Sequence, residues 1–141
     1  MVRIKIFSIG KTKESWLISA LSEYEKRLRP IMPIEWIFAK NNEQLQALVE
    51  KEPSFIALTP TGKEMTSEVF SQNLSLWFER FGSRLNFVIG GAEGLPPFFT
   101  NHAFQCLSLS KLTFTHQIAR LILLEQIYRA TEIQKGSEYH K

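Results

Sequence analysis

The sequence has a single cysteine, Cys106, among its 141 residues, and it contains no aspartate. One cysteine cannot form an intrachain disulfide, and we expect Cys106 to be a small buried residue on a strand rather than a catalytic thiol. The histidines at positions 102, 116 and 140 lack the spacing of metal ligands and have no cysteine partners. We therefore expect no metal site, and an acidic contact to a ribose hydroxyl would have to come from a glutamate.

Long hydrophobic runs are also missing. No stretch approaches the roughly 18 consecutive apolar residues that a membrane-spanning helix needs. The first residues alternate as in a strand and show no signal-peptide cleavage region, so we expect a cytoplasmic protein with no membrane partner. With 44% hydrophobic and 22% charged residues, the composition is that of an ordinary globular protein, and the length fits one domain over residues 1–141.

Charge is distributed unevenly along the sequence. Residues 1–30 contain seven Lys or Arg and three Glu, which gives a net charge of +4. Residues 31–110 contain five against eight (net −3), and residues 111–141 contain five against three (net +2). This pattern fits solvated helix faces, and it equally fits a phosphate-facing surface built from both ends of the chain. Charge alone does not separate the two interpretations.

Strands and helices are predicted to alternate along the chain. Alternating or continuous apolar residues predict strands at 2–10, 34–38, 55–58 and 87–89, with a fifth on or near 107–109. Helical spacing predicts helices at 16–28, 43–49, from a cap at Thr66 or Ser67 through 78, from the prolines at 96–97, and from a cap at Thr115 to about 133. Pro60-Thr61-Gly62 is predicted to be a turn. Such alternation predicts an α/β fold with a mostly parallel sheet and helices on both faces.

A glycine-rich segment, residues 90–94, follows the fourth strand. Its glycines allow main-chain atoms to approach a ligand closely, as loops after parallel strands often do in nucleotide-binding proteins. The spacing does not match the dinucleotide-binding fingerprint, which also follows the first strand of its fold. Taken alone, the segment is more typical of loop geometry than of binding.

Three other segments are ambiguous when taken singly. Residues 107–113 fit a strand and a turn, and His116 at a helix start is more typical of local hydrogen bonding than of catalysis. Residues 61–64 lack the upstream glycine and the final Ser or Thr of a phosphate-binding loop, which excludes an NTPase. The C-terminal residues would normally fray, but Tyr139 and His140 offer stacking and proton chemistry.

Together these segments match a known family in order. The matching motifs are FVIGGAEGL at 87–95, LSLSKLTFTH at 107–116, EQIYRA at 125–130 and the terminal Tyr139-His140, with further agreement at 4–10 and 57–63. The sequence resembles, over essentially its full length, the RlmH family of bacterial 23S rRNA pseudouridine N3-methyltransferases, minimal members of the SPOUT class. It departs from the family pattern at Thr59, Ala92, Thr115 and Gln117.

The resemblance implies a C-terminal trefoil knot whose loops hold S-adenosylmethionine, and a homodimer with composite active sites. It implies that Leu58 and Gly90 line the cofactor pocket. It also implies that the cofactor's adenine end is held, largely through the backbone, by Leu109, Ser110, Lys111, Leu112, Thr113 and Phe114. The implied substrate is 23S rRNA in the assembled ribosome, with no DNA partner.

The resemblance further places Tyr139 and His140 on a tail that reaches the partner's cofactor, and Arg129 on the substrate side. N3 of a pseudouridine is nucleophilic only after losing its proton, and His140, with an ordinary pKa of roughly 6.5, is the best base by residue type. Arg129 could stabilise the imide anion or bind a phosphate, and Tyr139 could stack on the base. Water as the base, a SPOUT enzyme for another rRNA or tRNA nucleotide, and a non-catalytic RNA-binding assembly factor remain alternatives.

Overall fold

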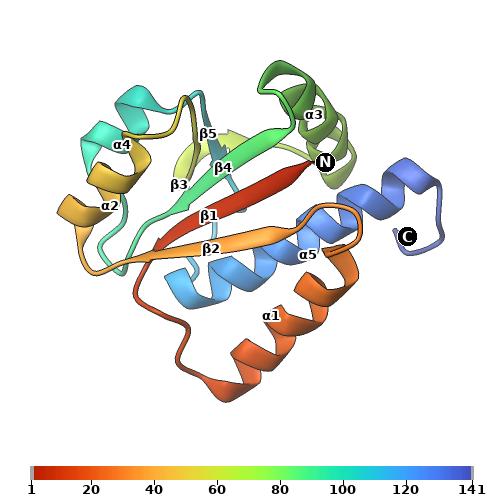
Figure 1. The fold of residues 1–141 in the computed structure, drawn as a ribbon, viewed down its shortest axis with the longest axis horizontal. Coiled ribbons are helices and arrows are strands. Elements are labelled where there is room, and N and C mark those ends of the chain that lie inside the picture. The colour runs from red at the N-terminus through yellow and green to blue at the C-terminus, as the bar shows by residue number, and fades with distance from the viewer. Residues whose placement is uncertain (1, 141) are drawn as a thin grey trace.

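The computed structural model describes residues 2–140, and within them five strands alternate with five helices (Figure 1). The elements are β1 (Arg3–Ile9), α1 (Ser15–Leu28), β2 (Ile34–Ala39), α2 (Asn42–Val49), β3 (Ile56–Glu64), α3 (Ser67–Arg80), β4 (Arg84–Ile89), α4 (Pro97–His102), β5 (Gln105–Ser108) and α5 (His116–Lys135). The predicted alternation is confirmed, and most boundaries agree within a few residues. No helix in this part of the chain is long and apolar enough to cross a membrane.

The strands form one sheet in the order β2-β1-β4-β3-β5, and every strand pair in it is parallel. Helices α1, α3 and α5 cover one face of the sheet, and α2 and α4 cover the other (Figure 1). The predicted α/β fold with helices on both faces is therefore confirmed. The central strand β4 is buried from Leu85 to Ile89, and its sequence is accordingly a largely continuous apolar run, whereas β1 alternates at its start.

The core has two layers, one on each face of the sheet. On the first face, Ile6 and Phe87 pack with apolar residues of α1, α3 and α5, such as Leu123. On the second face, Phe7 and Val88 pack with α2 and α4. Phe87 is fully buried in the central strand β4, so its truncation to alanine would cost about 3–5 kcal/mol.

The ends of α3 and α5 are set by capping residues. The Oγ1 atom of Thr66 accepts a hydrogen bond from the Val69 amide at 3.1 Å, and that of Thr115 accepts one from the Ile118 amide at 3.2 Å. Helix α5 ends at Gly136, whose left-handed backbone (φ 71°) suits glycine. The predicted caps are thus confirmed, whereas the trefoil knot remains a prediction.

Strand β3 differs from the prediction, because the expected turn at 60–62 lies inside a longer strand. Leu58 and Lys63 both pair with Leu107 of β5, so the four residues between them leave the ladder as a broad bulge. Gly62 makes the return possible, because a Cβ atom there would lie only 2.7 Å from the carbonyl carbon of Cys106. Cys106 lies on a strand as predicted, but it is half-buried rather than buried.

Candidate functional site

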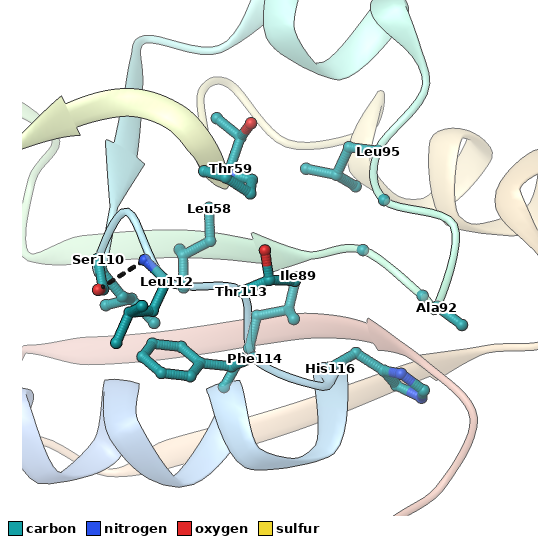
Figure 2. A pocket seen from close by; sticks show the side chains of 16 residues that line it. Leu58, Thr59, Ile89, Ala92, Leu95, Ser110, Leu112, Thr113, Phe114 and His116 are labelled. Carbon is teal, nitrogen blue, oxygen red and sulfur yellow. Dashed lines mark hydrogen bonds between the residues drawn. The ribbon is translucent and has the colours of Figure 1, made fainter.

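Three chain segments meet at the carboxyl-terminal edge of the sheet and enclose a cavity (Figure 2). They are the end of the regular part of β3, the loop after β4, and the loop from β5 into the first turn of α5. In parallel α/β sheets this edge is where ligands bind. The cavity is lined by Leu58, Thr59, Pro60, Ile89, Gly90, Gly91, Ala92, Gly94, Leu95, Leu109, Ser110, Leu112, Thr113, Phe114, His116 and Ala119.

The glycine loop after β4 folds back on itself. Gly94 has a left-handed backbone (φ 81°), and its amide donates to the carbonyl of Gly91 at 3.0 Å. A Cβ atom on Gly90 would lie 2.8 Å from the carbonyl carbon of Gly94. Glycine at 90 is therefore required by the close return of the loop itself, in line with the expectation that this segment reflects loop geometry.

The loop from β5 to α5 is held by hydrogen bonds of its own serines. The hydroxyl of Ser108 donates to the carbonyl of Ser110 at 2.9 Å. The Leu112 amide donates to Oγ of Ser110 at 3.0 Å, the bond drawn in Figure 2. These bonds turn the chain so that Leu112 and Phe114 flank the cavity before Thr115 caps α5. The serine-rich composition thus shapes the cavity wall.

Seven of the eight residues assigned to the cofactor by resemblance line this cavity, namely Leu58, Gly90, Leu109, Ser110, Leu112, Thr113 and Phe114. Lys111 is not among the lining residues. Its side chain is exposed, and Nζ lies 3.8 Å from Oε1 of Glu64. The assignment of these residues to a cofactor stays a prediction, but the structure brings all except Lys111 together.

Several lining residues were not assigned from the sequence. Thr59 and Ile89 lie at strand ends, a position that could have identified them, and Gly91, Gly94 and His116 belong to segments already noted. Leu95 ends the motif at 87–95, whereas nothing in the sequence pointed to Ala119, whose side chain reaches the cavity only through the fold.

Among the lining residues that the structure describes, His116 is the one side chain that can carry a charge in the neutral pH range. Burial lowers the pKa of His116 below its usual value, and the positive charges of Arg120 and Lys13 act in the same direction. The ring is therefore neutral at neutral pH. The cavity wall is consequently apolar and hydroxylic, and it does not repel a bound cation.

The three residues predicted to be catalytic form a separate cluster at the C-terminal end of α5. Nη1 of Arg129 lies 3.1 Å from Nδ1 of His140, and Nε2 of His140 lies 3.1 Å from Oε2 of Glu68. A guanidinium only donates, so Nδ1 accepts and Nε2 carries the proton that is donated to Glu68. This hydrogen bond from His140 lowers the pKa of Glu68.

Tyr139 joins this cluster through a hydrogen bond to Glu125. Its hydroxyl donates to Oε2 of Glu125 at 2.9 Å, and the same carboxylate oxygen accepts from Nη2 of Arg129 at 3.0 Å in an i,i+4 pair. The Tyr139 ring also packs edge-on against Tyr128, with centroids 4.9 Å apart. Burial, together with hydrogen bonds to Tyr24 and Glu125, raises the pKa of Tyr139 above its usual range.

The cavity borders the first turns of α5, whereas the C-terminal segment that carries Tyr139 and His140 follows the other end of this helix (Figure 1). His116 in the first turn lines the cavity, whereas Arg129 comes 13 residues later on the same helix. At 1.5 Å per residue, this separation is about 20 Å along the helix axis. The fold of one chain therefore does not bring its own Tyr139 and His140 to its own cavity.

Sequence reasoning missed Arg120, which is fully buried beside the cavity. Its guanidinium donates hydrogen bonds of 2.6–3.3 Å to side chains and carbonyls at the end of β1 and in the segments beside it. Within residues 2–140 its hydrogen-bond acceptors are all neutral, namely Ser8 Oγ, Ile9 O, Gly10 O, Thr12 Oγ1 and Gln117 Oε1. Burial lowers the pKa of Arg120 to about 10, so the group stays charged at neutral pH. The sequence signal that could have identified Arg120 is its position among the apolar residues of α5 that face the core.

Comparison with known proteins places this architecture in a family. A family model described as "Predicted SPOUT methyltransferase" matches residues 2–140. A ribosomal RNA large subunit methyltransferase H from Protochlamydia amoebophila is 55% identical over 100% of both chains. A protein of the same name from Prochlorococcus marinus is 42% identical over 99% of this chain and 96% of its own. The chain belongs to the SPOUT methyltransferase family.

Membership in the SPOUT family confirms the family resemblance inferred from the sequence motifs. A solved structure, a probable methylase family protein from Haemophilus influenzae Rd KW20, is similar with a TM-score of 0.60 over 99% of this chain and 70% of its own. Because that pair is only 12% identical, the likeness shows the fold alone. The family therefore rests on the family model and the relatives, and the structural neighbour adds a likeness of fold.

Proposed function

We propose that the protein transfers a methyl group from S-adenosylmethionine to N3 of a pseudouridine in 23S rRNA, on the assembled ribosome in the cytoplasm. The observation that carries the proposal is the cavity, because seven residues assigned to the cofactor from sequence motifs line one hollow. The relatives' name, ribosomal RNA large subunit methyltransferase H, supports the rRNA substrate. No metal takes part in the proposal.

The residues of the cavity fit such a cofactor. Leu58, Leu109 and Phe114 supply apolar surface for an adenine ring, and the hydroxyls of Ser110 and Thr113 can hydrogen-bond polar edges. A sulfonium cation meets no fixed positive charge in the wall, since His116 is neutral. When bound, S-adenosylmethionine supplies an activated methyl group, so the protein's main task is to align the acceptor nitrogen.

The C-terminal cluster can activate that nitrogen. His140 already carries its proton on Nε2, so Nδ1 is the atom that can accept the imide proton. In the structure Nδ1 accepts from Arg129, and the substrate must displace this contact. The released guanidinium can then donate to the imide anion, which stabilises it, and Tyr139 offers a ring for stacking on the base.

The proposal includes a homodimer in which the tail of one subunit serves the cavity of the other. Its support is the separation of about 20 Å along α5 between a chain's own cavity and its own cluster. In a twofold dimer the same contact is made twice, so a tail that reaches the partner's cavity completes both sites.

The decisive experiment is transfer of a labelled methyl group to intact ribosomes, followed by mapping of the labelled nucleotide. Label at N3 of one pseudouridine in 23S rRNA is the expected result. Label on tRNA or on another rRNA nucleotide would replace the proposal with a different SPOUT activity. Calorimetry that detects no S-adenosylmethionine binding would leave a non-catalytic RNA-binding assembly factor instead.

A further inference from the structure

The loop between β1 and α1, residues 10–14, lies beside the cavity. Ile9 precedes this loop, and its Cδ1 atom is 3.5 Å from the position of a Cβ atom on Gly91, a lining residue. In Figure 2, the end of β1 (pale red) passes close to His116 and the chain then turns away into the loop. The loop is thus a rim of the cavity on the side of the α5 N-terminus.

The buried guanidinium of Arg120 anchors this loop through hydrogen bonds. Its Nη2 donates to the carbonyls of Ile9 at 2.8 Å and Gly10 at 2.6 Å, and its Nη1 donates to Oγ1 of Thr12 at 2.9 Å. The backbone of the loop is therefore fixed at consecutive positions by one rigid, planar group. The side chains carried by the loop are presented from a defined backbone.

Two lysines of the loop face solvent. Lys11 and Lys13 are exposed, and no ion pair joins either of them to a carboxylate among residues 2–140. Lys13 lies close enough to His116 for its charge to contribute to lowering the pKa of that ring. Together with the buried Arg120, these lysines give the rim three positive charges. Its one negative charge is the exposed carboxylate of Glu14.

A buried guanidinium with neutral acceptors is a costly way to anchor a loop, because desolvation of the charge is not offset by an opposite charge. The guanidinium instead satisfies several loop oxygens at once and holds the loop backbone in one position. The anchor does supply a rigid loop and a positive potential at the cavity mouth. Both favour an anionic ligand that lies across the rim.

From this geometry we infer that residues 10–14 bind the phosphate groups of the RNA strand that flanks the target nucleotide. Lys11 and Lys13 contact the phosphates, and Arg120 acts as a positioning residue that holds the loop. The inference rests on the proposed function for the identity of the RNA, since the strand must lie across the cavity in which its base is methylated. Phosphate contacts of this kind fix the register of the strand without reading its sequence.

The test compares two double variants that remove the same charge at opposite edges of the sheet. Lys11→Gln/Lys13→Gln removes the loop lysines, and Lys51→Gln/Arg84→Gln removes two exposed cations at the amino-terminal edge. Binding to purified large ribosomal subunits is measured by co-sedimentation over a range of salt. The loop variant should bind about tenfold more weakly at physiological salt, with a log–log salt slope smaller by about 2.

The control variant should stay within about twofold of the wild type, and both should bind S-adenosylmethionine normally. Equal affinities and salt slopes for the two double variants would overturn the inference. Because binding is measured without turnover, the result stands apart from the proposed function. A wild-type protein that binds subunits but transfers no methyl group would refute that function. The binding comparison of the two double variants would still test the role of the loop.

Arg120→Lys tests the anchor. A lysine keeps the charge but cannot span the acceptors at Ser8, Gly10 and Thr12, so amide hydrogen exchange in residues 10–13 should accelerate. The KM for ribosomal subunits should rise severalfold while kcat is maintained, which a general loss of folded protein would not produce. Unchanged exchange and unchanged KM would show that Arg120 does not position the loop.

Discussion

Nη1 of Arg129 donates to Nδ1 of His140 at 3.1 Å, although the two lie eleven positions apart in the sequence. The contact folds the C-terminal tail back onto α5 and fixes the imidazole tautomer, with the proton on Nε2 facing Glu68. It also occupies the one nitrogen that could act as a base. If His140 acts as the proposed base, a substrate group must first displace the Arg129 donor from Nδ1.

Replacement of His140 by alanine should abolish proton removal while leaving the cavity intact. We expect single-turnover methyl transfer to ribosomes to fall by about 10²–10⁴-fold, the usual contribution of a general base. S-adenosylmethionine affinity should not change, because His140 does not line the cavity. His102→Ala, at an exposed histidine of α4, is the matched control. Full turnover by His140→Ala would assign the base to water or another group.

Mixing two inactive variants tests whether the tail acts on the partner's cavity. Random exchange between His140→Ala and a cavity variant such as Leu58→Arg makes half of all dimers mixed, and in each mixed dimer one site has both an intact cavity and an intact tail if the tail crosses to the partner. Random exchange should restore about a quarter of wild-type turnover if the tail crosses to the partner. Activity that stays at the level of the separate variants would show that each tail serves its own subunit.

Tyr139 should ionise at higher pH than an ordinary tyrosine. Its pKa is raised mainly by burial, so the neutral phenol is stabilised in the folded state. Because the folded pKa lies above the unfolded value, this contribution to stability is present below about pH 10 and is lost as the pH rises through the folded pKa. Ultraviolet titration of tyrosinate should show a late-ionising group that disappears in Tyr139→Phe. Titration of all tyrosines in the ordinary range would contradict the docked tail.

Sequence periodicity predicted the layers of this fold well, and the reasons are local. The apolar runs around Phe87 and Ile56 reflect strands buried on both faces, and Thr66 and Thr115 are capping residues whose chemistry acts within one turn. The bulge in β3 was not predictable in this way. Its cause is the approach of Gly62 to the backbone of β5, a contact between segments about 44 residues apart.

The cavity was partly predictable for a similar reason. Motif resemblance identified the loops, and the loops do meet, but the side-chain directions depend on backbone turns that motifs do not specify. Lys111 illustrates this, because its neighbours Ser110 and Leu112 line the cavity while its own side chain extends toward Glu64. Arg120 was missed because its role depends on carbonyl acceptors at Ile9 and Gly10, which lie far from it in the sequence.

The adjacent glycines of the β4 loop should respond differently to alanine. In Gly90→Ala the new Cβ atom would lie 2.8 Å from the Gly94 carbonyl carbon, so the loop must shift. In Gly91→Ala the nearest atom is Cδ1 of Ile9 at 3.5 Å, an ordinary contact. We expect Gly90→Ala to weaken S-adenosylmethionine binding at least tenfold and to cost about 1–3 kcal/mol of stability. Gly91→Ala, measured by the same calorimetry and urea unfolding, should change both little. Equal effects would mean that the loop return does not shape the cavity.

Replacement of Arg120 by methionine should destabilise the fold strongly despite the removal of a buried charge. The substitution leaves the hydroxyl of Ser8 and the carbonyls of Ile9 and Gly10 without their buried donor, and methionine cannot supply one. We expect the free energy of unfolding in urea to fall by about 3 kcal/mol. Arg84→Met, at an exposed arginine, should change it little. If Arg120→Met were as stable as the control, water would have to satisfy those acceptors, and the β1–α1 loop would owe its position to packing rather than to the guanidinium.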